Sequence, residues 1–337
     1  MVTVIMLSTI QYVNFTYTYI LDAADENNLT NGYLDTVLDW VPGMKDLRLR
    51  DLLTCCITTD SDEIMFNFCM DIAESAHEAS TVVIQSFDAL EQECLDTLST
   101  NYKLPNLYSI APLQLLLNSL PEDLLNPIQY NLWKENSECL QWLDIQKPNS
   151  VIYVNFGSTM VLTPQEVVEL GWGLANSNRP VLWVIRRDLI IGESACLSDE
   201  FLAEIKERSM IISWCPQEDV LNHRSIGGFL THCGWNSMLE SLSAGVPMLC
   251  YLFFAEQQTN CWLICHKLGV GLVIDNDVKR GQVEELVKEL MEGEKGKEMK
   301  SKAKEWKRLA EEATSPQGSS STNLDNLVSQ VLLKNNA

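Results

Sequence analysis

From Ser150 onward, short buried-strand runs alternate with helical segments, and this alternation restricts the fold more than any other feature of the chain. The strand runs are β-branched or aromatic and lie at residues 151–156, 181–185, 210–213 and 226–231. A strand–loop–helix–strand order with uniformly apolar strands is typical of a parallel sheet covered by helices. The sequence therefore predicts an α/β domain in this region.

The first of these units shows how its helix begins. After the run at 151–156, Gly157 and Ser158 make a turn, and Thr163-Pro164-Gln165-Glu166 follows. Thr at the N-cap, Pro at the first helical position and Glu at the third form a helix-start pattern. A helix is expected from there to about Ala175.

A second strand–helix segment carries the polar residues from which a binding site is predicted. The run ending at Thr231 is followed by His232-Cys-Gly-Trp-Asn236 and then Ser237-Met-Leu-Glu240. The Ser-x-x-Glu spacing predicts a capping box opening a helix that stops at Gly245. Backbone N–H groups at such a helix start bind anions, and Gly234 would let a phosphate come close. Taken alone, Ser-x-x-Glu is more often an ordinary capped helix.

Charge and cysteine content limit the partners and the compartment. The formal charge is −22, which argues against nucleic acid or anionic membranes as partners. Eleven cysteines without a CxxC or a Cys/His metal spacing indicate a reduced, cytoplasmic chain without a metal site. The apolar residues 1–21 lack a basic flank, since the first Lys or Arg is Lys45, so a core helix is expected there rather than stable membrane insertion.

The segment WCPQEDVLNHRSIGGFLTHCGWNSMLESLSAGVPMLCYLFFAEQ, residues 214–257, resembles the donor-binding signature of plant family 1 UDP-glycosyltransferases. The likeness extends from about Asn28 to Leu333 and is greatest to the group that includes cyanohydrin and flavonoid glucosyltransferases. It implies a GT-B fold of two facing Rossmann-like domains, the first incomplete here. It also implies inverting transfer of glucose from UDP-glucose to a small acceptor by a monomer, with no metal or other cofactor.

The resemblance assigns roles to residues. Trp214 would stack on uracil, the Cys215 backbone would read the base edge, and Gln217 and Glu240 would bind the ribose. A lone Trp after a strand is otherwise more often a core residue. The remaining donor contacts would come from Ser158, His232, Asn236 and Ser237 on the diphosphate and from Trp235, Glu256 and Gln257 on the hexose.

Two positions bear on the choice and placement of the sugar. In this family a terminal Gln, here Gln257, is associated with glucose donors. The family usually has Trp-Pro where this chain has Tyr251-Leu252. Loss of the proline restores backbone freedom and an N–H in the loop that presents the sugar-binding residues.

The family's catalytic His/Asp pair has no counterpart in this chain. His77, His223 and His266 lie in helix-like patterns and are interpreted as structural. The expected organisation is a remnant acceptor-binding domain plus linker at 1–137, a UDP-sugar domain at 138–312, and a C-terminal helix at 313–337 that packs on the first domain. An N-terminally truncated, noncatalytic UDP-sugar-binding product is therefore the alternative function, and a nucleotide-sugar epimerase is a weaker one.

Overall fold

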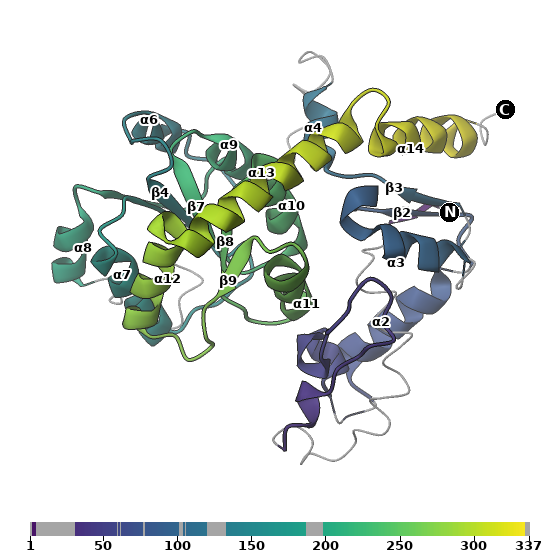
Figure 1. Ribbon diagram of the computed structural model, residues 1–337, viewed down its shortest axis with the longest axis horizontal. Coiled ribbons are helices and arrows are strands. Elements are labelled where there is room, and N and C mark those ends of the chain that lie inside the picture. Colours follow the sequence, from purple (N-terminus) through teal and green to yellow (C-terminus); the bar gives the residue numbers. More distant parts are fainter. Residues whose placement is uncertain are drawn as a thin grey trace. The chain divides into compact units, whose positions relative to one another are not determined.

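The computed structural model describes residues 2–4, 31–58, 60, 62–76, 78–100, 104, 106–119, 133–186 and 198–333. The chain divides into two compact units (Figure 1). The first comprises Met1–Leu125, Phe254–Trp262 and Arg308–Ala337, and the second comprises Asn126–Phe253 and Leu263–Lys307. The domain boundaries given above from sequence stay a prediction.

The second unit is built on a six-stranded parallel sheet. Its strands are β4 (Val151–Asn155), β5 (Val181–Val184), β6 (Ser209–Ile212), β7 (Ile226–Thr231), β8 (Met248–Cys250) and β9 (Gly271–Val273). Their spatial order is β6-β5-β4-β7-β8-β9, and every neighbouring pair is parallel. The four strands predicted from the apolar runs are confirmed.

This order places a topological switch point between β4 and β7. The chain lays strands outward from β4 to β6, returns to pair β7 with β4, and continues outward to β9. The loops leaving the carboxyl ends of β4 and β7 therefore diverge to opposite sides of the sheet. In open α/β sheets the crevice formed in this way is the usual place for a ligand.

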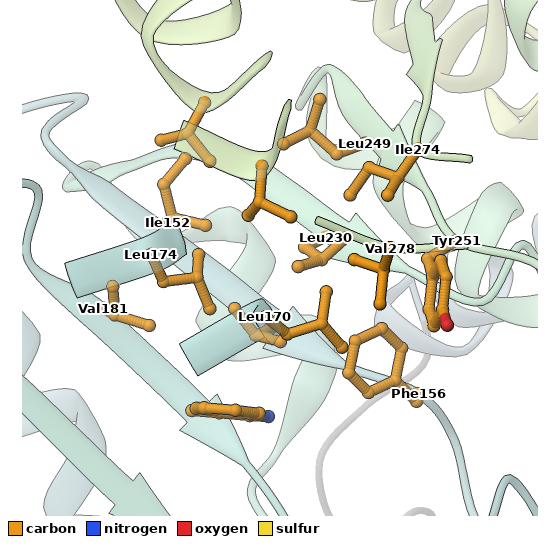
Figure 2. Packing of buried hydrophobic residues seen from close by; sticks show 14 of the residues in the cluster. Ile152, Phe156, Leu170, Leu174, Val181, Leu230, Leu249, Tyr251, Ile274 and Val278 are labelled. Atoms are coloured by element: carbon orange, nitrogen blue, oxygen red, sulfur yellow. The ribbon is translucent and has the colours of Figure 1, made fainter. Parts of the chain in front are cut away.

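Helices cover the two faces of this sheet (Figure 1). They are α6 (Glu138–Asp144), α7 (Pro164–Asn176), α8 (Asp199–Ile205), α9 (Gln217–Asn222), α10 (Trp235–Ala244), the π-helical turn η6 (Leu263–Lys267), α12 (Arg280–Glu292) and α13 (Glu294–Thr314). Helices α7 and α12 pack on each other and on the sheet. Ile152, Leu170, Leu174, Leu230 and Leu249 form the centre of this core (Figure 2).

Helix α7 begins as predicted. Thr163 is its N-cap, its hydroxyl accepts from the Glu166 N–H, and the Glu166 carboxylate accepts from the Thr163 N–H at 2.7 Å. The other oxygen of Glu166 accepts from the Tyr251 hydroxyl at 2.7 Å. Tyr251 itself is 1% exposed and lies edge-on to Phe156 at the end of the core (Figure 2). The residue that replaces the family's usual Trp is therefore a packed and hydrogen-bonded core side chain.

The predicted start of helix α10 is wrong. The helix begins at Trp235 with Gly234 as N-cap, three residues before the N-cap expected at Ser237, and no side chain caps it. Ser237 lies inside the first turn, where its hydroxyl accepts from the Gln217 side-chain amide instead. The predicted stop is confirmed, because Gly245 closes the helix in the left-handed conformation at φ 73°.

The first unit has a parallel sheet in the order β1-β2-β3 within the described residues. These strands are β1 (Val2–Val4), β2 (Thr81–Ile84) and β3 (Leu107–Ser109). The helix expected near the start of the chain is thus wrong for residues 2–4, which pair with β2, while residues 5–21 lie outside the described part. Among the helices that the structure describes, none has the length and apolarity needed to cross a bilayer.

Helices of the first unit are α2 (Ile64–Ser75), α3 (Asp88–Thr100), α4 (Leu113–Asn118), α11 (Gln257–Trp262), α14 (Ser319–Leu327) and the π-helical turn η7 (Val328–Leu332), with 3-10 turns η2 (Tyr33–Asp35), η3 (Leu49–Asp51) and η4 (Thr54–Cys56). Leu327 and Val331 pack against Val83 and Tyr108. Asn323 also donates to the Ser109 carbonyl at 3.0 Å. The last helices therefore belong to the core of this unit.

Candidate functional site

The candidate site lies at the switch point, where β4 and β7 end. Strand β4 ends at Asn155 and is followed by Phe156 and then by Gly157, which is at φ 77°. Strand β7 ends at Thr231, whose hydroxyl accepts from the Cys233 N–H at 3.2 Å. Cys233 is held at φ 63°, a conformation that a non-glycine residue adopts only when its surroundings impose it. This strained turn sets the direction in which His232 leaves the strand.

The His232 ring lies against two glycines. A Cβ on Gly157 would come within 2.8 Å of ring atoms, and a Cβ on Gly234 would come within 2.4 Å of Nε2. Both positions therefore need glycine for the ring to stay in place. Burial is the main cause that lowers the pKa of His232 to about 4, against a backbone hydrogen bond with Asn155 that raises it.

His232 is therefore neutral at physiological pH. Its Nδ1 is buried and has no hydrogen-bond partner among the described residues. A neutral imidazole carries one N–H donor, and a buried ring nitrogen without a partner costs free energy until a ligand or water satisfies it. The ring is suited to hold an oxygen-rich ligand.

The first turn of α10 lies next to this histidine in sequence and supplies further donors. Helix N-termini carry backbone N–H groups without an intrahelical acceptor, and Gly234 leaves this one without a side-chain cap. The Asn236 side chain is exposed, whereas Ser237 is buried and bonded to Gln217. An anion at this turn would meet partial positive charge in a chain that is acidic as a whole.

Gln217 is at the centre of a partly buried polar network. Its Oε1 accepts from Asn155 Nδ2 at 2.7 Å and from the Tyr153 hydroxyl at 2.9 Å. Its Nε2 donates to Ser237 Oγ at 3.0 Å and to Glu240 Oε2 at 2.6 Å. Protein groups thus occupy all four hydrogen-bonding positions of this amide, so Gln217 acts here through its neighbours.

Glu240 is the acidic group of this network. Burial raises its pKa to about 7, the Gln217 hydrogen bond opposes that shift, and the charge of Glu218 adds to it. A carboxyl with such a pKa is about half ionised at neutral pH. It can therefore change its charge when a ligand donates hydrogen bonds to it.

Trp214 follows β6 and belongs to an aromatic cluster. Its ring centroid is 6.5 Å from that of Trp133, tilted by 49°, and its carbonyl accepts from the Asn136 N–H at 3.0 Å. The guanidinium of Arg186 lies 3.8 Å from the Trp133 centroid and donates to the Ser158 carbonyl at 3.2 Å. This arrangement links the expected base-stacking residue to the expected phosphate loop.

The Cys215 thiol contacts the same network from the other side. It lies 3.3 Å from the Tyr153 hydroxyl and is buried. The side chain of Cys215 thus puts a sulfur against Tyr153, and the Cys215 backbone lies directly before Pro216, the N-cap of α9.

The expected sugar-binding residues divide between the two units. Trp235 belongs to the second unit and is 4% exposed. Glu256 and Gln257 belong to the first unit, where Gln257 is buried and its Oε1 accepts from the Phe254 N–H at 3.3 Å. Their loop is attached within that unit, because Ala255 donates to Thr54 Oγ1 at 2.9 Å.

The structure places Ser158, His232 and Ser237 in the same unit, and the sequence analysis missed four side chains of the site. These are Tyr153, Asn155, Trp133 and Arg186. An Asn at the end of an apolar strand, two residues before the turn glycine Gly157, was an available signal for Asn155. Of the histidines interpreted as structural, His223 caps the end of α9 and His266 lies in η6, while His77 is outside the described residues.

Comparison with known proteins shows what the chain is similar to. The family model described as UDP-glucoronosyl and UDP-glucosyl transferase matches residues 62–303. The (R)-mandelonitrile beta-glucosyltransferase of Prunus dulcis is 52% identical over 330 residues, which is 97% of this chain and 68% of that protein. The 7-deoxyloganetin glucosyltransferase of Catharanthus roseus is 56% identical over 305 residues, 90% of this chain and 62% of that protein. The chain thus spans about two thirds of the length of these relatives.

A solved structure agrees with this family of relatives. Phytolacca americana UGT2, complexed with UDP-2fluoro-glucose and pterostilbene, matches with a TM-score of 0.80 and 30% sequence identity. The match covers 98% of this chain and 70% of that one.

Proposed function

Because this chain belongs to the UDP-glucuronosyl and UDP-glucosyl transferase family and has its GT-B type of fold, we propose that it transfers glucose from UDP-glucose to a hydroxyl of a small acceptor, with inversion. The observation that carries the proposal is the site at the β4/β7 switch point. There a neutral, partly unsatisfied His232 is seated between two glycines, beside the uncapped start of α10. Backbone N–H groups at a helix start, which have no intrahelical acceptor, are matched by the oxygens of a diphosphate.

The nucleoside half of the donor is assigned to three residues. Trp214 stacks on uracil, the Cys215 backbone reads the base edge, and Glu240 accepts hydrogen bonds from the ribose hydroxyls. Support comes from the aromatic cluster around Trp214 and from the buried carboxyl of Glu240, whose Oε2 is bonded to Gln217. Gln217 contributes to ribose binding by holding that carboxyl.

The diphosphate is assigned to Ser158, His232, Asn236 and Ser237, with Gly234 allowing close approach of the backbone. In the transfer step the acceptor oxygen attacks the anomeric carbon as the bond from that carbon to the UDP oxygen breaks, and the hydroxyl proton passes to water or to a base outside the residues assigned here. Preorganised N–H donors at the departing phosphate would stabilise the developing charge, so we propose transfer without a metal ion. None of the residues assigned here is given the role of base for the acceptor proton.

The sugar and acceptor assignments rest on resemblance. Trp235, Glu256 and Gln257 are proposed to bind the hexose, and Gln257 favours glucose. The acceptor is proposed to be a small hydroxylated molecule such as a cyanohydrin, an iridoid alcohol or a flavonoid, because the relatives above are named for mandelonitrile and 7-deoxyloganetin. A cytoplasmic monomer is proposed from the acidic, cysteine-rich composition and the family likeness.

The test is transfer itself. The purified chain is incubated with UDP-glucose and each acceptor class, and the glucoside is measured by mass spectrometry alongside UDP release. Acceptor-dependent glucoside that is lost in His232→Ala supports the proposal. Calorimetric UDP binding without any glucoside would support the noncatalytic alternative, and absence of both would refute both functions.

A further inference from the structure

In this partly buried network the side-chain amide of Gln217 has one defined orientation, and one residue, Asn155, sets it. The Gly157 backbone N–H donates to the Asn155 side chain at 2.9 Å, so the atom facing Gly157 must be the oxygen, Oδ1. The other atom, Nδ2, therefore faces Gln217 at 2.7 Å and requires an acceptor there, Oε1. This places Gln217 Nε2 toward Glu240 and Ser237.

Tyr153 cannot set the orientation of the Gln217 amide, although its hydroxyl also contacts Gln217. A hydroxyl both donates and accepts, and its hydrogen rotates to suit its neighbours. The Tyr153 hydroxyl would therefore satisfy Gln217 in either orientation of the amide. Asn155 Nδ2 is only a donor, and Asn155 is 5% exposed, so water does not substitute for it.

The orientation of the Gln217 amide matters because it decides whether the Glu240 carboxylate can accept hydrogen bonds from a ribose. The Gln217 Nε2 donor at 2.6 Å makes Oε2 an acceptor, so the ionised carboxylate needs no proton on the Gln217 side. With the amide reversed, Gln217 Oε1 would face Glu240 Oε2, and two oxygens at this distance require a proton between them. A protonated Glu240 would then donate its hydrogen to Gln217. A neutral carboxyl accepts a hydrogen bond from a ribose hydroxyl less strongly than a carboxylate does.

We propose that Asn155 is a positioning residue which, through the orientation of Gln217, makes Glu240 an acceptor for the ribose hydroxyls of the donor nucleotide. The inference rests on the proposed function, since it concerns the same UDP site. It assigns Asn155 no contact with the nucleotide. Its measurable property is the preference for ribose over a sugar that lacks both hydroxyls.

The experiment is calorimetric titration with UDP and with 2′,3′-dideoxy-UDP, and the ratio of the two dissociation constants is the readout. This ratio cancels general effects of charge on diphosphate binding. In the wild type we expect UDP to bind at least about tenfold more tightly, the usual value of a hydrogen bond to a charged group. In Asn155→Asp, which replaces the donor Nδ2 by an acceptor, the ratio is expected to fall below about threefold.

A second substitution supplies a rescue that a merely structural role would not produce. In Asn155→Asp/Glu240→Gln the reversed Gln217 carbonyl accepts from the new amide at 240, whose own oxygen then faces the ribose. The double variant also restores the net charge. We expect it to regain a UDP preference within about threefold of the wild type, whereas Glu240→Gln alone loses it.

Tyr153→Phe is the matched control from the same network and should keep the preference. If Asn155→Asp does not show the wild-type circular dichroism spectrum, Asn155→Ala takes its place, with the same expected fall in the ratio. A wild type that does not bind UDP overturns the proposed function together with this inference. A wild type that prefers UDP, with the preference intact in the Asn155 variant or without rescue in the double variant, overturns the inference alone.

Discussion

The pKa of Glu240 predicts how donor affinity depends on pH. Burial raises that pKa to about 7, and ribose hydroxyls donate best to the ionised carboxylate. A group with this pKa is about 9% ionised at pH 6 and about 91% ionised at pH 8. If binding requires the ionised form, affinity for UDP-glucose rises about tenfold between these two pH values, or about 1.4 kcal/mol.

The sign follows from the direction of the pKa shift. The free protein holds a proton on Glu240 below pH 7, and the bound state releases it, so raising the pH favours binding. His232, whose pKa is about 4, stays neutral throughout this range and adds no slope. UDP-glucose is the suitable ligand, because its diphosphate is esterified on both sides and keeps a constant charge.

The assay is calorimetric titration at pH 6, 7 and 8 in buffers of different ionisation enthalpy, which also counts protons. About half a proton should leave per UDP-glucose bound at pH 7. Glu240→Gln is the control and should show neither the slope nor the proton release. A wild-type affinity that is flat or falls with rising pH, or a slope that survives in Glu240→Gln, would refute this reasoning.

Two further substitutions test the packing around the site. Gly234→Ala would place a Cβ 2.4 Å from the His232 ring, so UDP affinity measured by titration should drop at least tenfold. Gly281→Ala is the control, because its Cβ would meet no neighbouring side chain or backbone within 4 Å, and it should leave UDP affinity unchanged. Tyr251→Phe removes the hydroxyl that donates to Glu166 and should lower the free energy of unfolding in urea by about 1 kcal/mol; an unchanged midpoint would mean that this hydrogen bond contributes nothing to stability.

The features that could be predicted from the sequence are those encoded by residues close together along the chain. The strand runs and the start of α7 are encoded by residues a few positions apart, so they are readable without knowing the fold. The same local pattern failed at Ser237. Its Ser-x-x-Glu spacing is that of a capping box, but after the turn at Cys233 the helix begins at Trp235. The Ser237 hydroxyl then lies inside the helix and accepts a hydrogen bond from the Gln217 side-chain amide.

The missed residues depend on the order of strands in the sheet. Asn155 contacts Gln217 because β4 lies next to β7 at the centre of the sheet, a pairing between strands far apart in sequence. Arg186 reaches Ser158 and Trp133 for a similar reason, since β5 ends beside the loop after β4. In the sequence Arg186 is an ordinary residue at the end of an apolar run, and the position of Asn155 before a glycine turn does not say which side chain it contacts.

The central claim is that the carboxyl edge of the second sheet binds a UDP-sugar through His232 and the start of α10. The most direct measurement is the dissociation constant for UDP-glucose of the wild type and of His232→Ala, by calorimetry in one buffer at pH 8. We expect saturable, one-to-one binding by the wild type and at least tenfold weaker binding by the variant, since the proposed hydrogen bond between the imidazole and a charged phosphate is lost. Equal affinities, or no binding by a folded wild type, would contradict it.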